Sequence, residues 1–273
     1  MNLLMMNNDL LNQGMDLLVR SGFDRDEAAL DAWFLLQGLG EDRFLQGVKE
    51  RISRRPVAYI LGEWDFMGLT FVLDSHVLIP RPDTETLVEN AITWARGHWK
   101  REERYSVLDL CTGSGCIAIS LWKFLSPEYQ IRMTASDLSS QALAIAKENA
   151  QKHQADIQFL QGDLFEPAGD KYHMIVSNPP YIASRVISGL DPDVKDYEPM
   201  MALDGGEDGL TFYRRIIAEA PGYLEPGGVL MMEIGEEQAA DVAQLLRGGP
   251  YSGIRILKDL AGHDRVAEAT IER

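Results

Sequence analysis

From Tyr105 to the C-terminus, short apolar runs alternate with longer amphipathic segments. The apolar runs are bounded by turn residues and predict strands at residues 106–110, 131–136, 157–160, 173–177, 229–234, 255–260 and 266–271. The clearest helical spacing covers residues 139–153, 208–220 and 236–247. This alternation predicts an α/β fold with a doubly wound, mostly parallel sheet of seven strands. Ligands of such sheets bind at the carboxyl ends of the strands.

Residues 1–55 have the pattern of a small helical domain. Two sets of apolar residues have helical spacing, namely Ala28, Ala29, Ala32, Trp33 and Leu36 in the first and Phe44, Leu45, Val48 and Ile52 in the second. Asp24, with Glu27 three residues later, resembles a capping box at the start of the first helix. No residue pattern in this region indicates catalysis. We expect the helices to help shape a groove for a substrate.

A linker with a different character follows the helical region. Bulky residues alternate around a glycine in residues 66–73, which predicts a β-hairpin between two domains. The Pro-Arg-Pro stretch at 80–82 is stiff and extended, and Asp83 or Thr84 is expected to cap the next helix. The predicted organisation is a helical domain at 1–55, a hairpin linker at 56–80 and an α/β domain at 81–273.

Composition and charge limit the possible partners. The chain has 273 residues, of which 45% are hydrophobic and 25% charged, as in ordinary globular proteins. No apolar run reaches about eighteen residues, and Met1-Asn2-Leu3-Leu4 lacks the basic start of a signal peptide. We therefore expect no membrane segment and a cytoplasmic location. The net charge of −16 weighs against direct binding to nucleic acid and favours a protein partner.

Cysteines, histidines and clustered acids give no sign of a metal site. Cys111 and Cys116 match no zinc spacing and are expected to be free thiols. The five histidines are scattered, without carboxylates or cysteines at metal-ligand spacing. The acidic segment Asp191, Asp193, Asp196 and Glu198 is more typical of a solvated loop than of a metal site.

The first predicted strand ends in a glycine-rich turn, Cys111-Thr112-Gly113-Ser114-Gly115. Glycines allow the backbone to approach a ligand closely, but a tight strand-to-helix turn also needs them. Asp137 ends the second strand, twenty-four residues after Gly113. An acid at this position can accept the hydroxyl groups of a ribose, the alternative being a helix cap.

Asp163 ends the third predicted strand. Its carboxylate could accept an adenine amino group, with Leu164 and Phe165 packed on the ring, whereas the plainer alternative is an acid in a turn. Three such strand ends in succession favour a cofactor site over coincidence.

Asn178-Pro179-Pro180-Tyr181 ends the fourth predicted strand. Prolines have no N–H donor, so the loop cannot extend a sheet and its carbonyls are free to accept other hydrogen bonds. The side-chain oxygen of Asn178 and the Pro179 carbonyl form two acceptors beside an aromatic ring, which suits a planar –NH2 group. An ordinary loop with a packing tyrosine is the alternative. The motif indicates methylation of an amide or an exocyclic amine.

Together these motifs resemble those of class I methyltransferases that use S-adenosylmethionine. The chain is most similar to the PrmC/HemK family of release-factor glutamine methyltransferases, in the stretches 56–62, 79–85, 178–182, 198–199, 202–210 and 233–235. Asn-Pro-Pro-Tyr alone also occurs in DNA adenine methyltransferases, but the stretches 79–85 and 202–210 point to the protein-glutamine group. The family often has glycine where Cys111 stands, and cysteine fits there only if its φ is not positive.

The resemblance implies methyl transfer from S-adenosylmethionine to the amide nitrogen N5 of the glutamine in the Gly-Gly-Gln motif of peptide chain release factors. It implies cofactor contacts from Cys111, Thr112, Gly113, Ser114, Gly115, Asp137, Asp163, Leu164 and Asn178. Asn178, Pro179, Pro180 and Tyr181 would hold the glutamine, with Asn178, Pro179 and Tyr181 as catalytic residues and no metal. The alternatives are a glutamine of a ribosomal protein, an adenine in nucleic acid, or a cofactor-binding module without catalysis.

Overall fold

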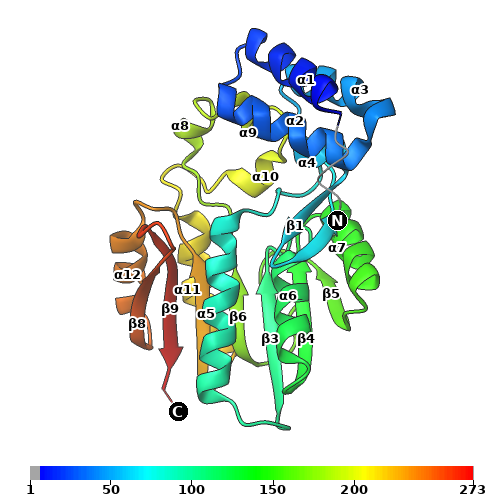
Figure 1. Ribbon diagram of the computed structural model, residues 1–273. Helices are drawn as coiled ribbons and strands as arrows, with labels where there is room; N and C mark the ends of the chain where they lie inside the picture. Colours follow the sequence, from blue (N-terminus) through cyan, green and yellow to red (C-terminus); the bar gives the residue numbers. More distant parts are fainter. Residues whose placement is uncertain (1–6, 273) are drawn as a thin grey trace.

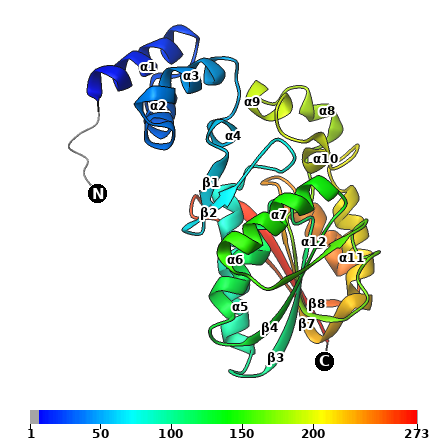
Figure 2. The same cartoon turned by 90° about the vertical axis from the view of Figure 1, so that its right-hand side faces the viewer.

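The computed structural model describes residues 7–272 (Figure 1). Helices of the N-terminal region lie above an α/β domain, and a small hairpin lies between them (Figures 1 and 2). The expectations for residues 1–6, as part of the helical domain and as lacking a signal peptide, fall outside the described residues. Between residues 7 and 272, no helix has the length and apolar character needed to cross a membrane.

Seven strands form the predicted sheet, in the order β5-β4-β3-β6-β7-β9-β8. The strands are β3 (Arg104–Leu110), β4 (Gln130–Asp137), β5 (Ile157–Gln161), β6 (Tyr172–Ser177), β7 (Leu224–Glu233), β8 (Tyr251–Lys258) and β9 (Asp264–Ile271). Pairing from β5 to β7 is parallel, and only β9 runs antiparallel to its neighbours β7 and β8. β4 and β5 lie on one side of β3, and β6 and β7 lie on the other. The strand order therefore reverses at β3, and the crevice for a ligand lies at the carboxyl ends of β3 and β6.

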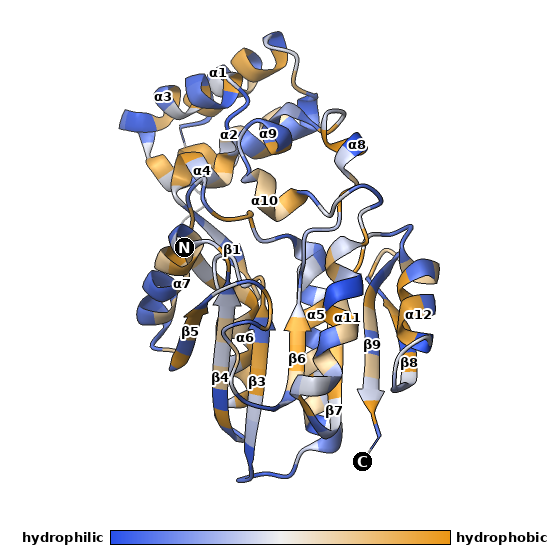
Figure 3. Ribbon diagram, turned by 180° about the vertical axis from the view of Figure 1, so that it is seen from behind, coloured by the Kyte–Doolittle hydropathy of each residue, from blue (hydrophilic) through white to orange (hydrophobic). Residues whose placement is uncertain are grey.

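Helices cover both faces of the sheet, which confirms the doubly wound prediction (Figure 2). One face carries α5 (Pro82–His98), α6 (Cys116–Leu125) and α7 (Ser140–His153), and the other carries α11 (Thr211–Tyr223) and α12 (Ala239–Arg247). Neighbouring strand residues alternate between the two cores, as Met174 and Ile175 do in β6. Because both faces are buried, the central strands β3 and β6 are apolar along much of their length (Figure 3).

The N-terminal helices are α1 (Asn8–Arg20), α2 (Arg25–Leu39), α3 (Glu41–Ile52) and the short α4 (Val57–Leu61). The predicted apolar face of α2 was partly wrong, because Ala29 and Trp33 are exposed. The buried stripe is Ala28, Ala32, Leu35 and Leu36, whose spacing keeps them on one side of a helix. Asp24 caps α2 through the Asp26 N–H (2.8 Å), but Glu27 pairs with Arg51 instead of closing a capping box.

The predicted hairpin consists of β1 (Glu63–Phe66) and β2 (Leu69–Val72), paired antiparallel. Its two turn residues, Met67 and Gly68, both have positive φ, which matches the twist of a two-residue hairpin. Asn149 of α7 accepts from the Val72 N–H (2.7 Å) and donates to the Val72 carbonyl (3.0 Å). The hairpin is therefore fixed to the α/β domain.

Helix α5 begins before its predicted caps, Asp83 or Thr84. Arg81 is the N-cap, no side chain caps the helix, and Pro82 is the first helical residue. The expectation that Asp83 or Thr84 caps the helix was wrong, because proline is well suited to the first helical position. Asp83 and Thr84 instead lie inside the first turn. Three short helices follow β6, namely α8 (Ser184–Ile187), α9 (Pro192–Lys195) and α10 (Met200–Leu203).

Candidate active site

A cavity of about 480 Å³ lies at the carboxyl ends of β3, β4, β5 and β6. The four strand ends identified in the sequence therefore meet around one space. Of the predicted site residues, the cavity is lined by Cys111, Thr112, Gly113, Ser114, Asp137, Asp163, Leu164, Asn178 and Pro180. Gly115, Pro179 and Tyr181 are not among the lining residues. The loop before α5 and residues 199–202 complete the wall.

The turn between β3 and α6 begins with a cysteine in the left-handed region, at φ 59°. The expectation that Cys111 requires a negative φ was therefore wrong. This conformation costs a non-glycine residue roughly 1–2 kcal/mol. Two hydrogen bonds hold the turn, from the Thr112 N–H to the Ser136 carbonyl (3.0 Å) and from the Gly115 N–H to the Thr112 carbonyl (2.9 Å). Both cysteines are free thiols, as predicted.

Asp109 supports this turn through hydrogen bonds, a role that was not predicted from the sequence. Its Oδ2 accepts hydrogen bonds from the Thr112 hydroxyl (2.6 Å) and the Ala118 N–H (3.2 Å). The side chain is completely buried, and burial raises its pKa to about 7. The sequence feature that could have indicated this role is a single acidic residue inside an apolar strand, directly before a glycine-rich turn.

Asp137 joins the glycine-rich turn to α7. Its Oδ2 accepts from the Gly113 N–H (2.9 Å), and its Oδ1 accepts from the Ser139 N–H (2.9 Å). Ser139 is the N-cap of α7 and bonds the Ala142 N–H (3.1 Å), so capping of the helix does not depend on Asp137 alone. Burial raises the pKa of Asp137. A carboxylate offers about four acceptor sites, so Asp137 retains capacity for ligand hydroxyls.

The end of β5 is built differently from the prediction. Asp163 lines the cavity and pairs with Arg215 of α11 (2.9 Å), while Leu164 supplies an apolar side chain. Phe165 is completely buried and stacks on Tyr223 with ring centroids 4.6 Å apart. The expectation that Phe165 packs on a ligand ring was wrong, because this side chain points into the core.

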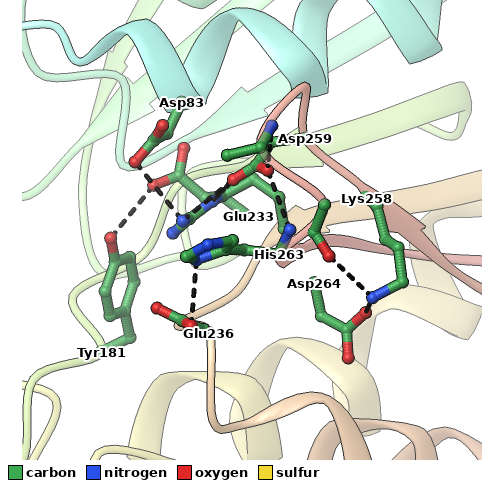
Figure 4. Close-up of polar contacts among 11 residues, drawn as sticks. Asp83, Tyr181, Glu233, Glu236, Lys258, Asp259, His263 and Asp264 are labelled. Atoms are coloured by element: carbon green, nitrogen blue, oxygen red, sulfur yellow. Dashed lines mark hydrogen bonds and ion pairs between the residues drawn. The ribbon is translucent and has the colours of Figure 1, made fainter.

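The Asn-Pro-Pro-Tyr loop directs its asparagine and its tyrosine to different partners. Asn178 lines the cavity, and its Nδ2 donates to Thr84 Oγ1 (3.2 Å). The hydroxyl of Tyr181 donates to Oε1 of the buried Glu233 (3.1 Å), as Figure 4 shows. Burial raises the pKa of Tyr181 above its ordinary value. Tyr181 thus packs behind the loop, against the core, rather than along the cavity wall.

The acidic segment after this loop is not simply solvated. Glu198 is buried, forms an ion pair with Arg81 and accepts from the Ile79 N–H (3.2 Å). Asp193 pairs with Arg51 of α3 (2.6 Å). The solvated-loop expectation was therefore wrong for Glu198 and Asp193, whose partners lie far away in the sequence.

These ion pairs hold the segment against both parts of the molecule. Figure 1 shows α10 between the N-terminal helices and the sheet, and α9 beside those helices, where Asp193 pairs with Arg51. Pro199, Met200, Met201 and Ala202, which follow Glu198, line the cavity. The sequence did not predict these lining residues or Thr84 as part of the site. Pro199, Ala202 and Thr84 lie within the stretches 198–199, 202–210 and 79–85 noted in the sequence, whereas Met200 and Met201 lie outside them. Within residues 7–272, no group of three His, Cys, Asp or Glu side chains is arranged to hold a metal ion.

Comparison with known proteins gives a consistent assignment. The family model of the methyltransferase small domain matches residues 97–189. A methyltransferase structure from Pyrococcus furiosus superimposes with a TM-score of 0.57 at 16% identity, over 82% of this chain and 100% of that one, which shows a shared fold.

Two curated relatives are much more similar in sequence. The release factor glutamine methyltransferase of Geobacter sulfurreducens is 44% identical over 82% of this chain and 76% of its own length. That of Bordetella pertussis is 40% identical over 92% of this chain and 97% of its own length. On this similarity, the chain belongs to the family of release factor glutamine methyltransferases.

Proposed function

We propose that this protein transfers a methyl group from S-adenosylmethionine to the side-chain amide nitrogen N5 of a glutamine, within the Gly-Gly-Gln motif of peptide chain release factors. One observation carries the proposal: Asn178 lies on the wall of the same cavity as the glycine-rich turn and Asp137. A cofactor bound by the turn would thus have its reactive end near an amide-binding group. The proposal places the reaction in the cytoplasm, where peptide release occurs.

S-adenosylmethionine fits the residues that line the cavity. A Cβ added at Gly113 would meet open space, so the backbone there can be approached by a ligand. Asp137 has acceptor capacity for ribose hydroxyls, and Leu164 offers an apolar surface to the adenine. Asp163 could accept the adenine amino group beside its ion pair with Arg215. The bound cofactor would supply an electrophilic methyl group.

The residues of the chain would activate the substrate by orientation rather than by a strong base. An amide nitrogen is a weak nucleophile because its lone pair is delocalised into the carbonyl. We assign Asn178 Oδ1 and the Pro179 carbonyl to accept the two N–H groups of the glutamine amide. This would aim the nitrogen at the methyl group and stabilise the positive charge that grows on it. Pro180 forms part of the wall, and Tyr181 holds the loop in place.

The test is transfer of tritium from labelled S-adenosylmethionine to a purified release factor. The matched control is the same factor with the glutamine of its Gly-Gly-Gln motif changed to alanine. Label on the normal factor and none on the altered one is the expected result. Label on adenine-containing DNA or on ribosomal proteins, with none on the factor, would overturn the proposal.

A further inference from the structure

The stretch 202–210, one of the motifs of the sequence, supplies no group to the proposed methyl transfer. In the structure it lies against the chain that leaves the Asn-Pro-Pro-Tyr loop. The N–H of Ile182, directly after the loop, donates to the Leu203 carbonyl (3.0 Å), and the Gly205 N–H donates to the Ile182 carbonyl (2.8 Å). The stretch is therefore bonded through its backbone to the end of the loop.

The two segments approach so closely that no side chain fits at Gly205, which is buried. A Cβ added there would lie 2.7 Å from the Cα of Tyr181 and 2.9 Å from the carbonyl oxygen of Pro180. Both atoms belong to the backbone of the Asn-Pro-Pro-Tyr loop, which cannot rotate away as the end of a flexible side chain could. Gly205 does not have a positive φ. Glycine is therefore needed at this position for space, so that the loop can keep its place.

The side-chain amide of Gln238, the residue before α12, holds both segments. Its Nε2 donates to the carbonyls of Tyr181 (3.0 Å) and Gly209 (3.2 Å). Its Oε1 accepts from the Gly235 N–H (3.0 Å) and from the Tyr213 hydroxyl (3.3 Å). Backbone carbonyls only accept and backbone N–H groups only donate, so these partners fix the orientation of the amide. Both donor hydrogens and both acceptor sites of Gln238 are thus used within the protein.

The loop held in this way carries the acceptors assigned to the glutamine amide. Asn178 and Pro179 belong to the same four-residue loop as Tyr181. The two prolines restrict the backbone between Asn178 and Tyr181, so a displacement of Tyr181 is passed on to the acceptors. Methyl transfer requires an aligned nitrogen, and a misplacement of about 1 Å can reduce a rate about a hundredfold.

We propose that Gln238 and Gly205 are positioning residues that set the place of the Asn-Pro-Pro-Tyr loop at the cofactor cavity. Neither is among the residues that line the cavity, so each acts through the loop and not on a ligand. The inference rests on the proposed function, because it takes this loop to hold the reacting amide.

The first test is Gln238→Glu, which keeps the length and an acceptor of the side chain but replaces the Nε2 donor by an oxygen. We expect kcat and kcat/KM to fall together, about ten- to a hundredfold, because the alignment matters in the transition state. KM for the protein substrate and affinity for S-adenosylmethionine, the latter measured by calorimetry, should stay within about twofold. The matched control is Gln244→Glu, the same change at an exposed position of α12, which should leave kcat unchanged.

The second test is Gly205→Ala, in which the added methyl group must displace the backbone of Tyr181. It should reduce kcat to a similar degree, again with affinity for S-adenosylmethionine retained. The matched control is Gly222→Ala, an exposed position in α11 where an added Cβ would meet open space. This control should leave kcat unchanged.

Hydrogen exchange reports on the loop without any substrate. In Gln238→Glu and Gly205→Ala, the Ile182 N–H should exchange at least about tenfold faster than in the unaltered protein, because its bond to Leu203 opens more often. The N–H of the buried Ile175, in the middle of β6, is the reference for the sheet and should exchange at its unaltered rate.

The outcomes separate this inference from the proposed function. Kinetics are measured on whichever substrate the unaltered enzyme labels, so failure to label a release factor concerns only the proposed function. Unchanged kcat in both variants, or unchanged exchange at Ile182, would overturn the positioning role. A loss of kcat accompanied by lost cofactor affinity or by faster exchange at Ile175 would also overturn it, because it would indicate a general structural role.

Discussion

At the scale of single residues, Asp137 holds the local structure of the site, and we propose that it also binds the ribose of the cofactor. Its two oxygens hold the Gly113 turn and the start of α7, and its remaining acceptor sites are available to the cavity. Asp137→Ala should weaken the binding of S-adenosylmethionine by roughly 1–3 kcal/mol, because a buried hydroxyl loses its acceptor. Calorimetric titration measures this, with the exposed Asp156→Ala as control. Unchanged affinity would remove Asp137 from the ribose site.

Asn178 carries the largest expected effect on the reaction itself. Asn178→Ala removes the acceptor proposed to orient the glutamine nitrogen. Turnover should fall by a factor on the order of 10²–10³, as when one preorganised polar group is lost from other active sites. Single-turnover methyl transfer at saturating cofactor is the measurement. Near-normal turnover would exclude this role for Asn178.

The buried Asp109, next to the glycine-rich turn, should make the stability of the protein depend on pH. Burial raises its pKa from 3.8 to about 7, so the folded state favours the protonated carboxyl. The contribution of Asp109 to the free energy of unfolding is fully present below pH 3.8. It decreases by at most about 4 kcal/mol as the pH rises to about 7. Asp109→Asn keeps an acceptor for Thr112 but cannot titrate.

The difference in free energy of unfolding between the two proteins should therefore change with pH. The unaltered protein should lose stability relative to Asp109→Asn between about pH 4 and pH 7, since only its carboxyl releases a proton in that range. Urea unfolding at several pH values measures the difference. A difference that is constant across this range would contradict the assignment.

At the scale of elements, Arg51 holds α2, α3 and α9 together. Its side chain is 4% exposed and pairs with Asp31 (2.6 Å), Glu27 (2.8 Å) and Asp193 (2.6 Å). Arg51→Ala would leave Asp31 poorly solvated and unpaired, which typically costs about 3–5 kcal/mol. Urea unfolding is the measurement, and Arg43→Ala, an exposed change on the same helix, is the control. Equal stability of the two variants would show that the cluster contributes little.

Local patterns were sufficient to predict the sheet and most helices. Strand–helix alternation follows from the burial of both faces of the sheet, so apolar runs identify the strands directly. Side-chain contacts between distant segments were not predictable in this way. Glu198 pairs with Arg81 across 117 positions of the chain, and Asn178 bonds Thr84 across 94. The left-handed conformation of Cys111 likewise depends on the hydrogen bonds of the folded turn.

At the scale of the whole molecule, a second cleft lies between the N-terminal helices and the α/β domain. Its volume is about 420 Å³, and its lining includes five acidic residues, Glu27, Asp31, Asp191, Asp193 and Glu198, against three arginines, Arg51, Arg54 and Arg81. The net charge of the chain is −16. An acidic groove beside the cavity would attract a basic surface of a protein substrate.

Asp191 offers a test of this attraction, because it is exposed on the cleft and is not one of the residues proposed to bind the cofactor or the glutamine. Asp191→Lys should raise KM for the release factor about three- to tenfold, and the effect should shrink as salt increases, since screening weakens contacts between exposed charges. Asp156→Lys makes the same charge change on an exposed turn outside both cavities. If both variants raise KM equally, net charge alone guides the substrate and the cleft has no special part in docking. A rise confined to Asp191→Lys, with cofactor affinity unchanged, would place the substrate protein across the two parts of the molecule.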